Sequence, residues 1–245
     1  MSEPEADTRT GWNEQSEQLF IDFGRYFVPE RELQIQTVCD LIPPRAGPFH
    51  LLELCCGEGL LAAALLERFP GCIVHGFDGS PVMLRLSQRR LAQYGERFAT
   101  QQFDLHARDW RTPHWPLHAV VSSLAIHHLD AQEKQELYAD VYQMLSAGGV
   151  LVIADLILPT HEAGVTVAAR MWDEAVRHRA LELDGTEDAF EYFRREQWNY
   201  YEFPDSFDKP SPLFDHLKWL EQAGFRDVDV YWLKAGHAIY GGRKA

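Results

Sequence analysis

The chain has 245 residues, enough for one large domain or for a domain with a cap, and its hydrophobic share of 46% and charged share of 24% are ordinary for a globular protein. Its formal net charge of −14 disfavours a nucleic-acid partner, because an acidic surface repels a phosphate backbone. A small molecule is easier to reconcile with this charge.

The cysteines and the N-terminus predict a cytoplasmic protein. The four cysteines are Cys39, Cys55, Cys56 and Cys72, and they form no C-x-x-C pair, so we expect free thiols and no metal site. Residues 1–10 are polar and acidic, without the apolar segment of a signal peptide. No apolar run approaches the roughly 18 residues of a transmembrane helix, so no membrane partner is expected.

The first part of the chain predicts a tail, two helices and then alternating elements. Residues 1–10 are expected to be disordered, and apolar residues recur at helical spacing from Trp12 to Ile42, with Pro29 dividing two helices. The predicted strands that follow are residues 49–54, 72–77, 98–103, 117–123 and 150–154. The predicted helices between them are residues 60–69, a helix capped by Ser80-Pro81, and residues 132–145. This alternation predicts a largely parallel sheet with helices on both faces.

The pattern changes after Asp155. Residues 160–212 lack strand patterning and are rich in aromatic and charged side chains. A helix at 213–223 and strands at 228–233 and 238–240 follow, and too few residues separate these strands for a crossover, so they must pair antiparallel. The predicted fold is an α/β doubly wound seven-stranded sheet with an antiparallel last strand, N-terminal helices over the ligand site (1–48), a core (49–156 and 213–245) and a helical cap insert (157–212).

Acidic side chains stand where the first three predicted strands end. Ligands of doubly wound sheets bind beyond the carboxyl ends of the strands, so these positions define the candidate site. Glu53 closes the first strand beside a loop of small residues. Asp78 can accept hydrogen bonds from both hydroxyls of a ribose, and Asp104 can accept one from an exocyclic amino group. These features suit an adenosine.

A dinucleotide site is the competing interpretation. Residues 57–62 (Gly-Glu-Gly-Leu-Leu-Ala) fit the G-x-G-x-x-A pattern, with an acid about 20 residues on. Three features count against it. Glu53 would face a pyrophosphate unfavourably, the chain ends in an antiparallel strand, and no second mononucleotide-binding half follows Asp155.

Four ordered motifs resemble the class I S-adenosylmethionine (AdoMet)-dependent methyltransferases, especially those acting on small molecules, which have a Rossmann-like fold. The motifs are LLELCCGEG at 51–59, GFDGSPVML at 76–84, AVVSSLAIHHL at 119–129 and LSAGGVLVIAD at 145–155. The resemblance covers roughly residues 49–156 and 213–245. It implies AdoMet as cofactor and S-adenosylhomocysteine as product, and it is only weakly specific for the substrate.

Carried over by position, the resemblance assigns cofactor contacts. Glu53 would contact the methionine amino end, Asp78 the ribose, and Ser123 and Leu124 the sulfonium side. In similar enzymes an aromatic or basic residue of the N-terminal helices meets the cofactor carboxylate, which points to Tyr26 or Arg25, although an amphipathic helix packed on the sheet explains this segment equally well. The expected cofactor-binding residues are Tyr26, Glu53, Cys55, Gly57, Asp78, Gly79, Met83, Asp104, Leu105, Ser123 and Leu124. The family usually has glycine where this chain has Cys55, so we expect reduced clearance there.

His127 and His128 follow the fourth strand, where a substrate would meet the methyl group. A neutral imidazole can accept a proton from a hydroxyl or ammonium nucleophile. His128 is the preferred catalytic candidate, because it aligns with a histidine that some similar small-molecule methyltransferases use at the active site. A structural histidine bonded to the backbone is at least as good an explanation, since methyl transfer depends mainly on positioning. Asp155 ends the fifth strand and would bind a cation on the substrate or cap the next segment.

The insert is expected to form a lid. Its aromatic residues, among them Trp198 and Tyr200, are candidates for binding an amine substrate by cation–π contact, but a plain hydrophobic core for the cap is the favoured explanation.

The sequence thus predicts an enzyme that moves the AdoMet methyl group to an O, N or C nucleophile of a small-molecule acceptor. The alternatives are other AdoMet chemistry, such as carboxymethyl transfer, or AdoMet binding without catalysis. Both a monomer and a homodimer fit the sequence.

Overall fold

One seven-stranded sheet organises the chain, and a computed structural model describes residues 14–245, with side chains from residue 21 onward. The tail expected at 1–10, with Trp12, lies outside the described residues. The strands are β1 (Phe49–Leu54), β2 (Cys72–Asp78), β3 (Phe98–Gln102), β4 (Leu117–Ser123), β5 (Leu145–Leu156), β6 (Arg226–Lys234) and β7 (His237–Arg243). Their order is β3-β2-β1-β4-β5-β7-β6, and only β7 runs antiparallel to its neighbours. The predicted α/β fold, a seven-stranded sheet with an antiparallel last strand, is confirmed.

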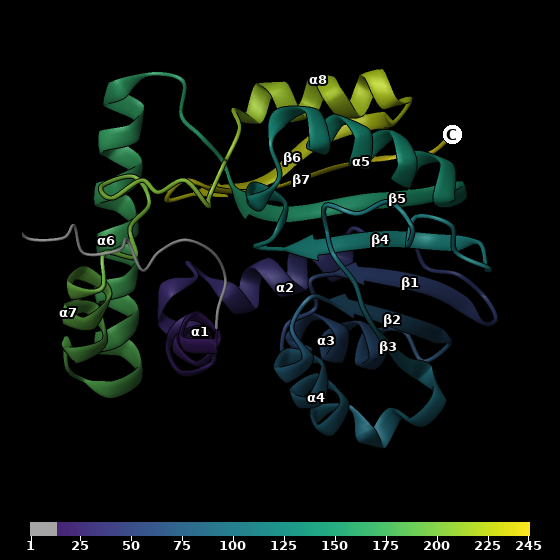
Figure 1. Ribbon diagram of the computed structural model, residues 1–245, viewed down its shortest axis with the longest axis horizontal. Helices are drawn as coiled ribbons and strands as arrows, with labels where there is room; N and C mark the ends of the chain where they lie inside the picture. Colours follow the sequence, from purple (N-terminus) through teal and green to yellow (C-terminus); the bar gives the residue numbers. More distant parts are fainter. Residues whose placement is uncertain (1–13) are drawn as a thin grey trace, which may run out of the picture.

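Helices flank both faces of this sheet (Figure 1). The described α-helices are α1 (Glu14–Phe27), α2 (Arg31–Asp40), α3 (Leu60–Arg68), α4 (Pro81–Arg90), α5 (Ala131–Met144), α6 (Glu162–Asp184), α7 (Asp188–Arg195) and α8 (Leu213–Ala223). Short 3-10 turns lie at Ala92–Arg97 and Ile126–His128. Each predicted helix in the described part of the chain is present, and the Ser80 hydroxyl caps α4 as expected.

Alternation along β1 divides the core into two layers. Leu52 and Leu54 belong to the hydrophobic cluster that α5 and α8 cover, with Tyr138 of α5 fully buried in it. Leu51 points to the opposite face, into the cluster that α2 and α3 cover. Successive side chains of a strand face opposite ways, so Glu53 lies on the same face as Leu51, beneath the start of α3.

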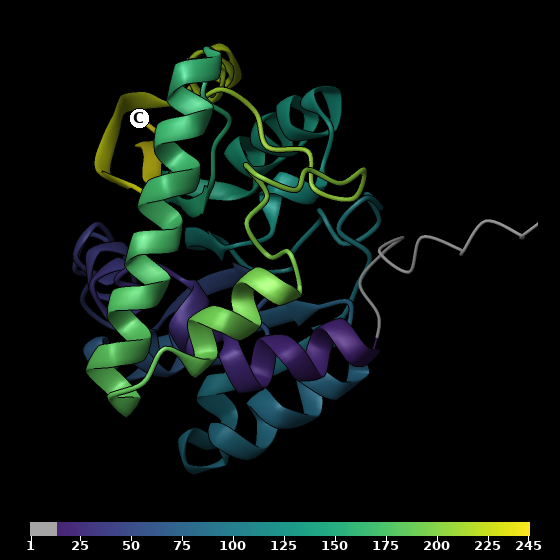
Figure 2. The ribbon, with the colours of Figure 1, turned by 90° about the vertical axis from the view of Figure 1, so that its left-hand side faces the viewer.

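The cap lies beyond the carboxyl ends of the parallel strands, where the arrows of β4 and β5 point toward α6 (Figure 1). Helices α6 and α7 pack with α1 as a layer in front of the sheet (Figure 2). Trp172 of α6 forms the centre of this layer: its ring is 5.6 Å from that of Phe193, and its Nε1 donates to the Phe27 carbonyl at 2.7 Å. The cap therefore has a hydrophobic core of its own.

Strand β5 is longer than the sequence predicts. The expected strand begins at Val150, but Leu145 already pairs with Leu117, and a register shift follows before Ala119 pairs with Val150. Gly148, with φ +76°, takes up the irregularity. The Gly148 N–H also bonds the Lys244 carbonyl at 2.8 Å, so the end of the chain holds this segment in the sheet.

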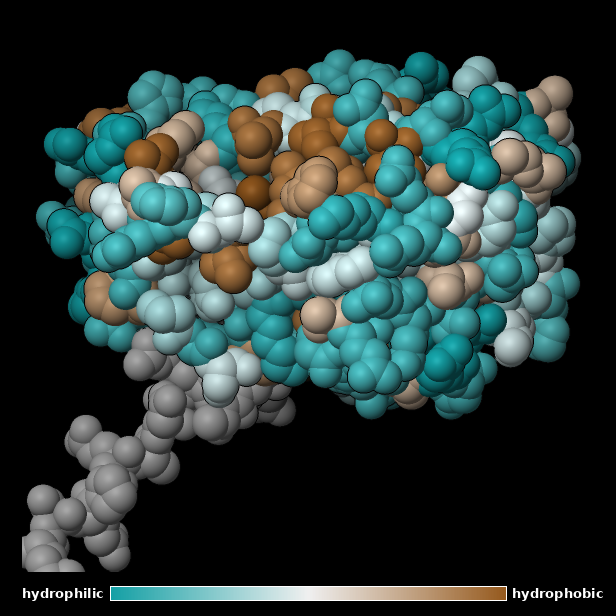
Figure 3. Space-filling view, turned by 90° about the horizontal axis from the view of Figure 1, so that it is seen from above, coloured by the Kyte–Doolittle hydropathy of each residue, from teal (hydrophilic) through white to brown (hydrophobic). Residues whose placement is uncertain are grey.

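The surface on the side of α8 is mostly hydrophilic, with hydrophobic residues gathered toward its middle (Figure 3). Phe214 and Leu233 are 65% and 59% exposed. None of the helices in residues 14–245 combines the length and apolar character that crossing a bilayer requires.

Candidate active site

The loop after β1 turns through three residues with left-handed backbone. Cys55, Gly57 and Gly59 have φ values of +56°, +53° and +82°. A Cβ added to Gly57 would meet no atom within 4 Å, whereas one added to Gly59 would lie 3.0 Å from the Cβ of Ser87 in α4. Gly57 therefore borders open space where a ligand can approach the backbone, and Gly59 permits close packing of α3 on α4. The positive φ of Cys55 is a backbone conformation that glycine would adopt without strain.

Glu53 is a buried acid with an unused acceptor. Its side chain is 2% exposed, and no described residue bonds its Oε2. Burial and the nearby Asp78 raise the pKa of Glu53 well above its usual value, although a hydrogen bond from the Ala62 backbone opposes this shift. A buried carboxylate oxygen without a donor is costly unless a ligand supplies one. A cationic amino group fits this position.

Asp78, at the end of β2, connects the loop after β2 to the loop after β1 by hydrogen bonds. Its Oδ2 accepts a hydrogen bond from the Gly57 N–H at 2.8 Å, and its Oδ1 accepts one from the Ser80 N–H at 2.8 Å. The residue is 8% exposed. Each oxygen of an ionised carboxylate has two lone pairs, so both can accept further bonds from a pair of ribose hydroxyls.

The other expected adenosine contacts surround these two loops. A Cβ on Gly79 would lie 3.4 Å from the Phe103 carbonyl, and Met83 and Leu105 are buried apolar side chains. Asp104 is exposed, and its Oδ1 accepts a hydrogen bond from the His106 N–H at 2.9 Å. Apolar side chains and one exposed carboxylate are what a stacked adenine with an amino group would require.

The end of β4 brings the sheet against the cap. Ser123 and Leu124 are half-buried, and Leu124 has a positive φ of +56°. Its N–H donates to the Ala154 carbonyl at 2.9 Å, and its side chain packs against the cap cluster. Residues expected on the sulfonium side thus lie between strand ends and cap.

His127 is held by Asp155. The His127 backbone N–H donates to Asp155 Oδ2 at 2.9 Å, and its ring Nδ1 lies 2.5 Å from Oδ1, which also accepts from the Leu156 N–H at 2.8 Å. Burial lowers the pKa of His127, but Asp155 and Asp208 outweigh it and raise that pKa to about 9. The Asp155 carboxylate, an expected substrate-binding group, is therefore engaged within the protein.

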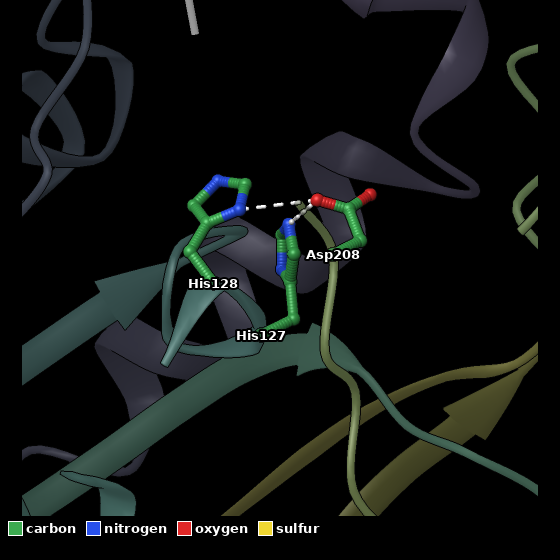
Figure 4. Close-up of side chains that lie close together, drawn as sticks. All are labelled: His127, His128 and Asp208. Carbon is green, nitrogen blue, oxygen red and sulfur yellow. Dashed lines mark ion pairs between the residues drawn. The ribbon is translucent and has the colours of Figure 1, made fainter. Parts of the chain in front are cut away.

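Asp208, which no sequence motif marks, completes this cluster. Its Oδ1 lies 3.5 Å from His127 Nε2 and 3.1 Å from His128 Nδ1, so both rings converge on one carboxylate oxygen (Figure 4). The Phe207 ring packs 4.3 Å from the His128 ring. Burial is the main cause that lowers the pKa of His128, and the charge of His127 adds to it.

A buried lysine anchors the segment that carries Asp208. Lys134 of α5 is 0% exposed, and its ammonium donates to the Ser211 hydroxyl at 2.9 Å and to the Lys209 carbonyl. The Lys209 N–H in turn donates to the His127 carbonyl at 2.7 Å. No motif marks this loop in the sequence, and the unusual burial of Lys134 is visible only in the fold.

The remaining expected residues lie in α1 and in the cap. The Tyr26 hydroxyl donates to Asp184 at 2.6 Å, and the Trp198 ring packs 5.1 Å from the Phe27 ring. Burial, followed by the charge of Asp208, raises the pKa of Tyr200. Tyr200 is thus the member of this group within electrostatic reach of the histidine cluster.

Sequence comparison links the chain to methyltransferases. Residues 51–149 match a family model described as a methyltransferase domain. An uncharacterized methyltransferase of Geobacillus thermodenitrificans is 32% identical over 153 residues, which cover 62% of each chain. Another, of Mycobacterium tuberculosis, is 31% identical over 122 residues, covering 49% of this chain and 56% of the relative. The chain thus spans about three fifths of the length of the relatives it matches.

Solved structures share the fold at low identity. An O-methyltransferase family protein of Burkholderia thailandensis superposes with a TM-score of 0.64 at 16% identity, covering 94% of this chain and 60% of that one. The phosphoethanolamine N-methyltransferase 2 of Haemonchus contortus, solved with S-adenosyl-L-methionine, gives a TM-score of 0.59 at 18% identity, covering 91% and 44%.

The matched domain contains the β1 loop, Asp78 and the histidine pair, and the sheet has the strand order and antiparallel β7 expected for this fold. Residues 51–149 thus match a methyltransferase domain, and the chain has the fold of solved S-adenosylmethionine-dependent methyltransferases.

Proposed function

We propose that this protein transfers the methyl group of AdoMet to an O, N or C nucleophile of a small-molecule acceptor. The buried Oε2 of Glu53, which no described residue bonds, carries the proposal. It lies in β1 immediately before the loop in which Gly57 faces open space, and Asp78 closes that loop from β2. An amino acid joined to a nucleoside matches this pair of acids better than a pyrophosphate does.

The residues of the chain would bind and orient the reactants. Glu53 would accept a hydrogen bond from the ammonium group, and Asp78 would accept from the ribose hydroxyls. Bound AdoMet supplies a methyl group on a positively charged sulfur. Ser123 and Leu124 would line that side, while the cap would keep water from it. Holding the acceptor in line with the methyl group is the main catalytic requirement.

The histidine cluster marks the proposed acceptor side. Burial, followed by the charges of Asp78, Asp155 and Glu53, raises the pKa of Cys55, so this loop residue lies in the field of both the cofactor acids and the partner of His127. The structural neighbours include proteins named for O- and for N-methylation, so this fold accommodates more than one kind of accepting atom. The proton-accepting role of His128 stays a prediction.

Incubation with methyl-labelled AdoMet and a panel of hydroxyl, amine and carbon acceptors tests this function. We expect labelled product together with an equal amount of S-adenosylhomocysteine. AdoMet binding without turnover over the whole panel would favour a binding role. Transfer of a group other than methyl, detected by mass spectrometry, would favour other AdoMet chemistry, and thermal stabilisation by NADH but not by AdoMet would contradict the assignment.

A further inference from the structure

We propose that His127, His128 and Asp208 form a binding site for a divalent transition metal, of which Zn²⁺ is the representative. Each residue offers one ligand atom, and the three atoms lie within 4.8 Å of one another. Two imidazoles and one carboxylate are a donor set that suits zinc and iron(II), and three protein ligands leave a coordination position open for a substrate.

The distances fit such an ion. Bonds of about 2.0–2.2 Å in a tetrahedral arrangement require ligand atoms about 3.4 Å apart. Asp208 Oδ1 is 3.5 Å from His127 Nε2 and 3.1 Å from His128 Nδ1. Two of the three edges therefore need little change, and the third, between the two histidine nitrogens, is no longer than 4.8 Å.

The surroundings of His127 are those of a metal ligand. Asp155 engages its Nδ1 at 2.5 Å, so Nε2 is the nitrogen presented to Asp208. A carboxylate behind a ligating histidine fixes the ring orientation and raises its basicity. With Asp208 in front and Asp155 behind, two negative charges would offset an added dication in this buried place.

The site is also reachable and anchored. The His128 and Asp208 side chains are 19% and 22% exposed, which gives an ion a route from solvent. The bond from the Lys209 N–H to the His127 carbonyl fixes the segment carrying Asp208 beside the histidines. The ligands thus come from two elements 80 positions apart that the fold itself holds together.

A metal here would define the acceptor class. It would bind an oxygen group, a hydroxyl or carboxylate, and would lower the pKa of a coordinated hydroxyl so that the ionised oxygen can attack the methyl carbon while the C–S electron pair goes to sulfur. The proton would leave to solvent, and His128 would serve as ligand instead of proton acceptor. This role rests on the proposed methyl transfer, whereas metal binding does not.

Metal binding by the chelator-treated full chain is the test. Zn²⁺ would be titrated in competition with a chromophoric chelator, and Co²⁺ would be followed by its visible absorption. We expect one ion per chain, and in Asp208→Asn and His128→Gln a loss of affinity larger than the roughly 10- to 100-fold typical of an outer-shell partner. The exposed pair His106 and Glu133 is the matched control for surface binding, so His106→Ala should bind as the unaltered protein does.

Circular dichroism of each variant separates loss of the site from loss of the fold. Absence of stoichiometric Zn²⁺ and Co²⁺ binding, or unchanged affinity in folded Asp208→Asn and His128→Gln, would overturn the site. Metal binding without methyl transfer to any acceptor would leave the site standing and contradict only the proposed function. Methyl transfer that persists unchanged after chelation would overturn the role given to the metal.

Discussion

Asp155 accepts two hydrogen bonds from a single residue, His127: the backbone N–H donates to Oδ2 at 2.9 Å, and the ring Nδ1 lies 2.5 Å from Oδ1. The pair fixes which ring nitrogen faces Asp208. Asp155 is 1% exposed, and both of its oxygens are engaged within the protein.

Replacing Asp155 by asparagine tests this positioning. Asp155→Asn keeps the shape and one acceptor oxygen but removes the charge behind the imidazole. We expect Zn²⁺ affinity to fall about 10-fold, since outer-shell partners typically contribute that much, with AdoMet affinity unchanged. Competition titration and calorimetry measure the two quantities. Equal Zn²⁺ affinity in a folded variant would show that Asp155 does not support His127 in this way.

Substitutions of Cys55 test whether the backbone of the loop after β1 is strained. The φ of +56° at Cys55 costs a residue with a Cβ about 1–2 kcal/mol, a cost that glycine avoids. Cys55→Gly and Cys55→Ala both remove the sulfur and differ only in the Cβ. We expect the glycine variant to have a free energy of unfolding about 1 kcal/mol higher than the alanine variant in urea denaturation, and AdoMet affinity at least equal to that of the unaltered protein. Equal stability of the two variants would mean that the loop carries no such strain.

Glu53 predicts a pH dependence of stability. Its pKa in the folded protein is raised by burial and by Asp78, so above about pH 4.5 the folded state holds a proton that the unfolded state has released. The resulting stabilisation is complete below the unfolded pKa and is lost as pH rises through the folded pKa. Glu53→Gln has no group that titrates there, so it does not lose this stabilisation. The free energy of unfolding of the variant, minus that of the unaltered protein, should therefore increase as pH rises.

Urea denaturation between about pH 5 and about pH 8, without AdoMet, measures this difference. Glu67→Gln, at an exposed position of α3, is the control and should show no trend. A difference between Glu53→Gln and the unaltered protein that does not vary with pH would contradict a raised pKa.

Much of the proposed cofactor side consists of residues that local sequence places at strand ends, because periodicity and glycine turns define those ends. Glu53 and Asp78 are one such case, and Ser80-Pro81 marks a helix start on its own. On the proposed acceptor side, the sequence indicates the histidine pair after β4 but not its carboxylate partner Asp208. Asp208 meets His127 and His128 across 81 and 80 positions, from a loop without periodicity, and only the packed cap brings them together.

The start of β5 likewise depends on long-range contacts that the local sequence does not reveal. Gly148 and Gly149 indicate a turn in the sequence, yet β5 starts before them, because Leu145 pairs with Leu117 and Lys244 bonds both glycines through its backbone. Long-range pairing overrides the local signal here.

We predict that Lys134 stabilises the segment that carries Asp208. Lys134→Met keeps the side-chain volume but leaves the Lys209 carbonyl and the Ser211 hydroxyl without their donor. We expect a loss of about 1–3 kcal/mol in the free energy of unfolding and faster limited proteolysis near residue 208. Ser211→Ala removes one of the two bonds and should have a smaller effect. Proteolysis at the unaltered rate in Lys134→Met would show that the lysine does not anchor this loop.

The central claim is that AdoMet occupies the space above the β1 loop with its ribose on Asp78. Titration calorimetry of AdoMet with the unaltered protein, with Asp78→Ala and with Asp188→Ala, an exposed carboxylate of α7, tests it most directly. The account predicts that Asp78→Ala weakens AdoMet binding by about 1–3 kcal/mol while Asp188→Ala binds as before. Unchanged AdoMet affinity in Asp78→Ala, or no binding by the unaltered protein, would contradict it.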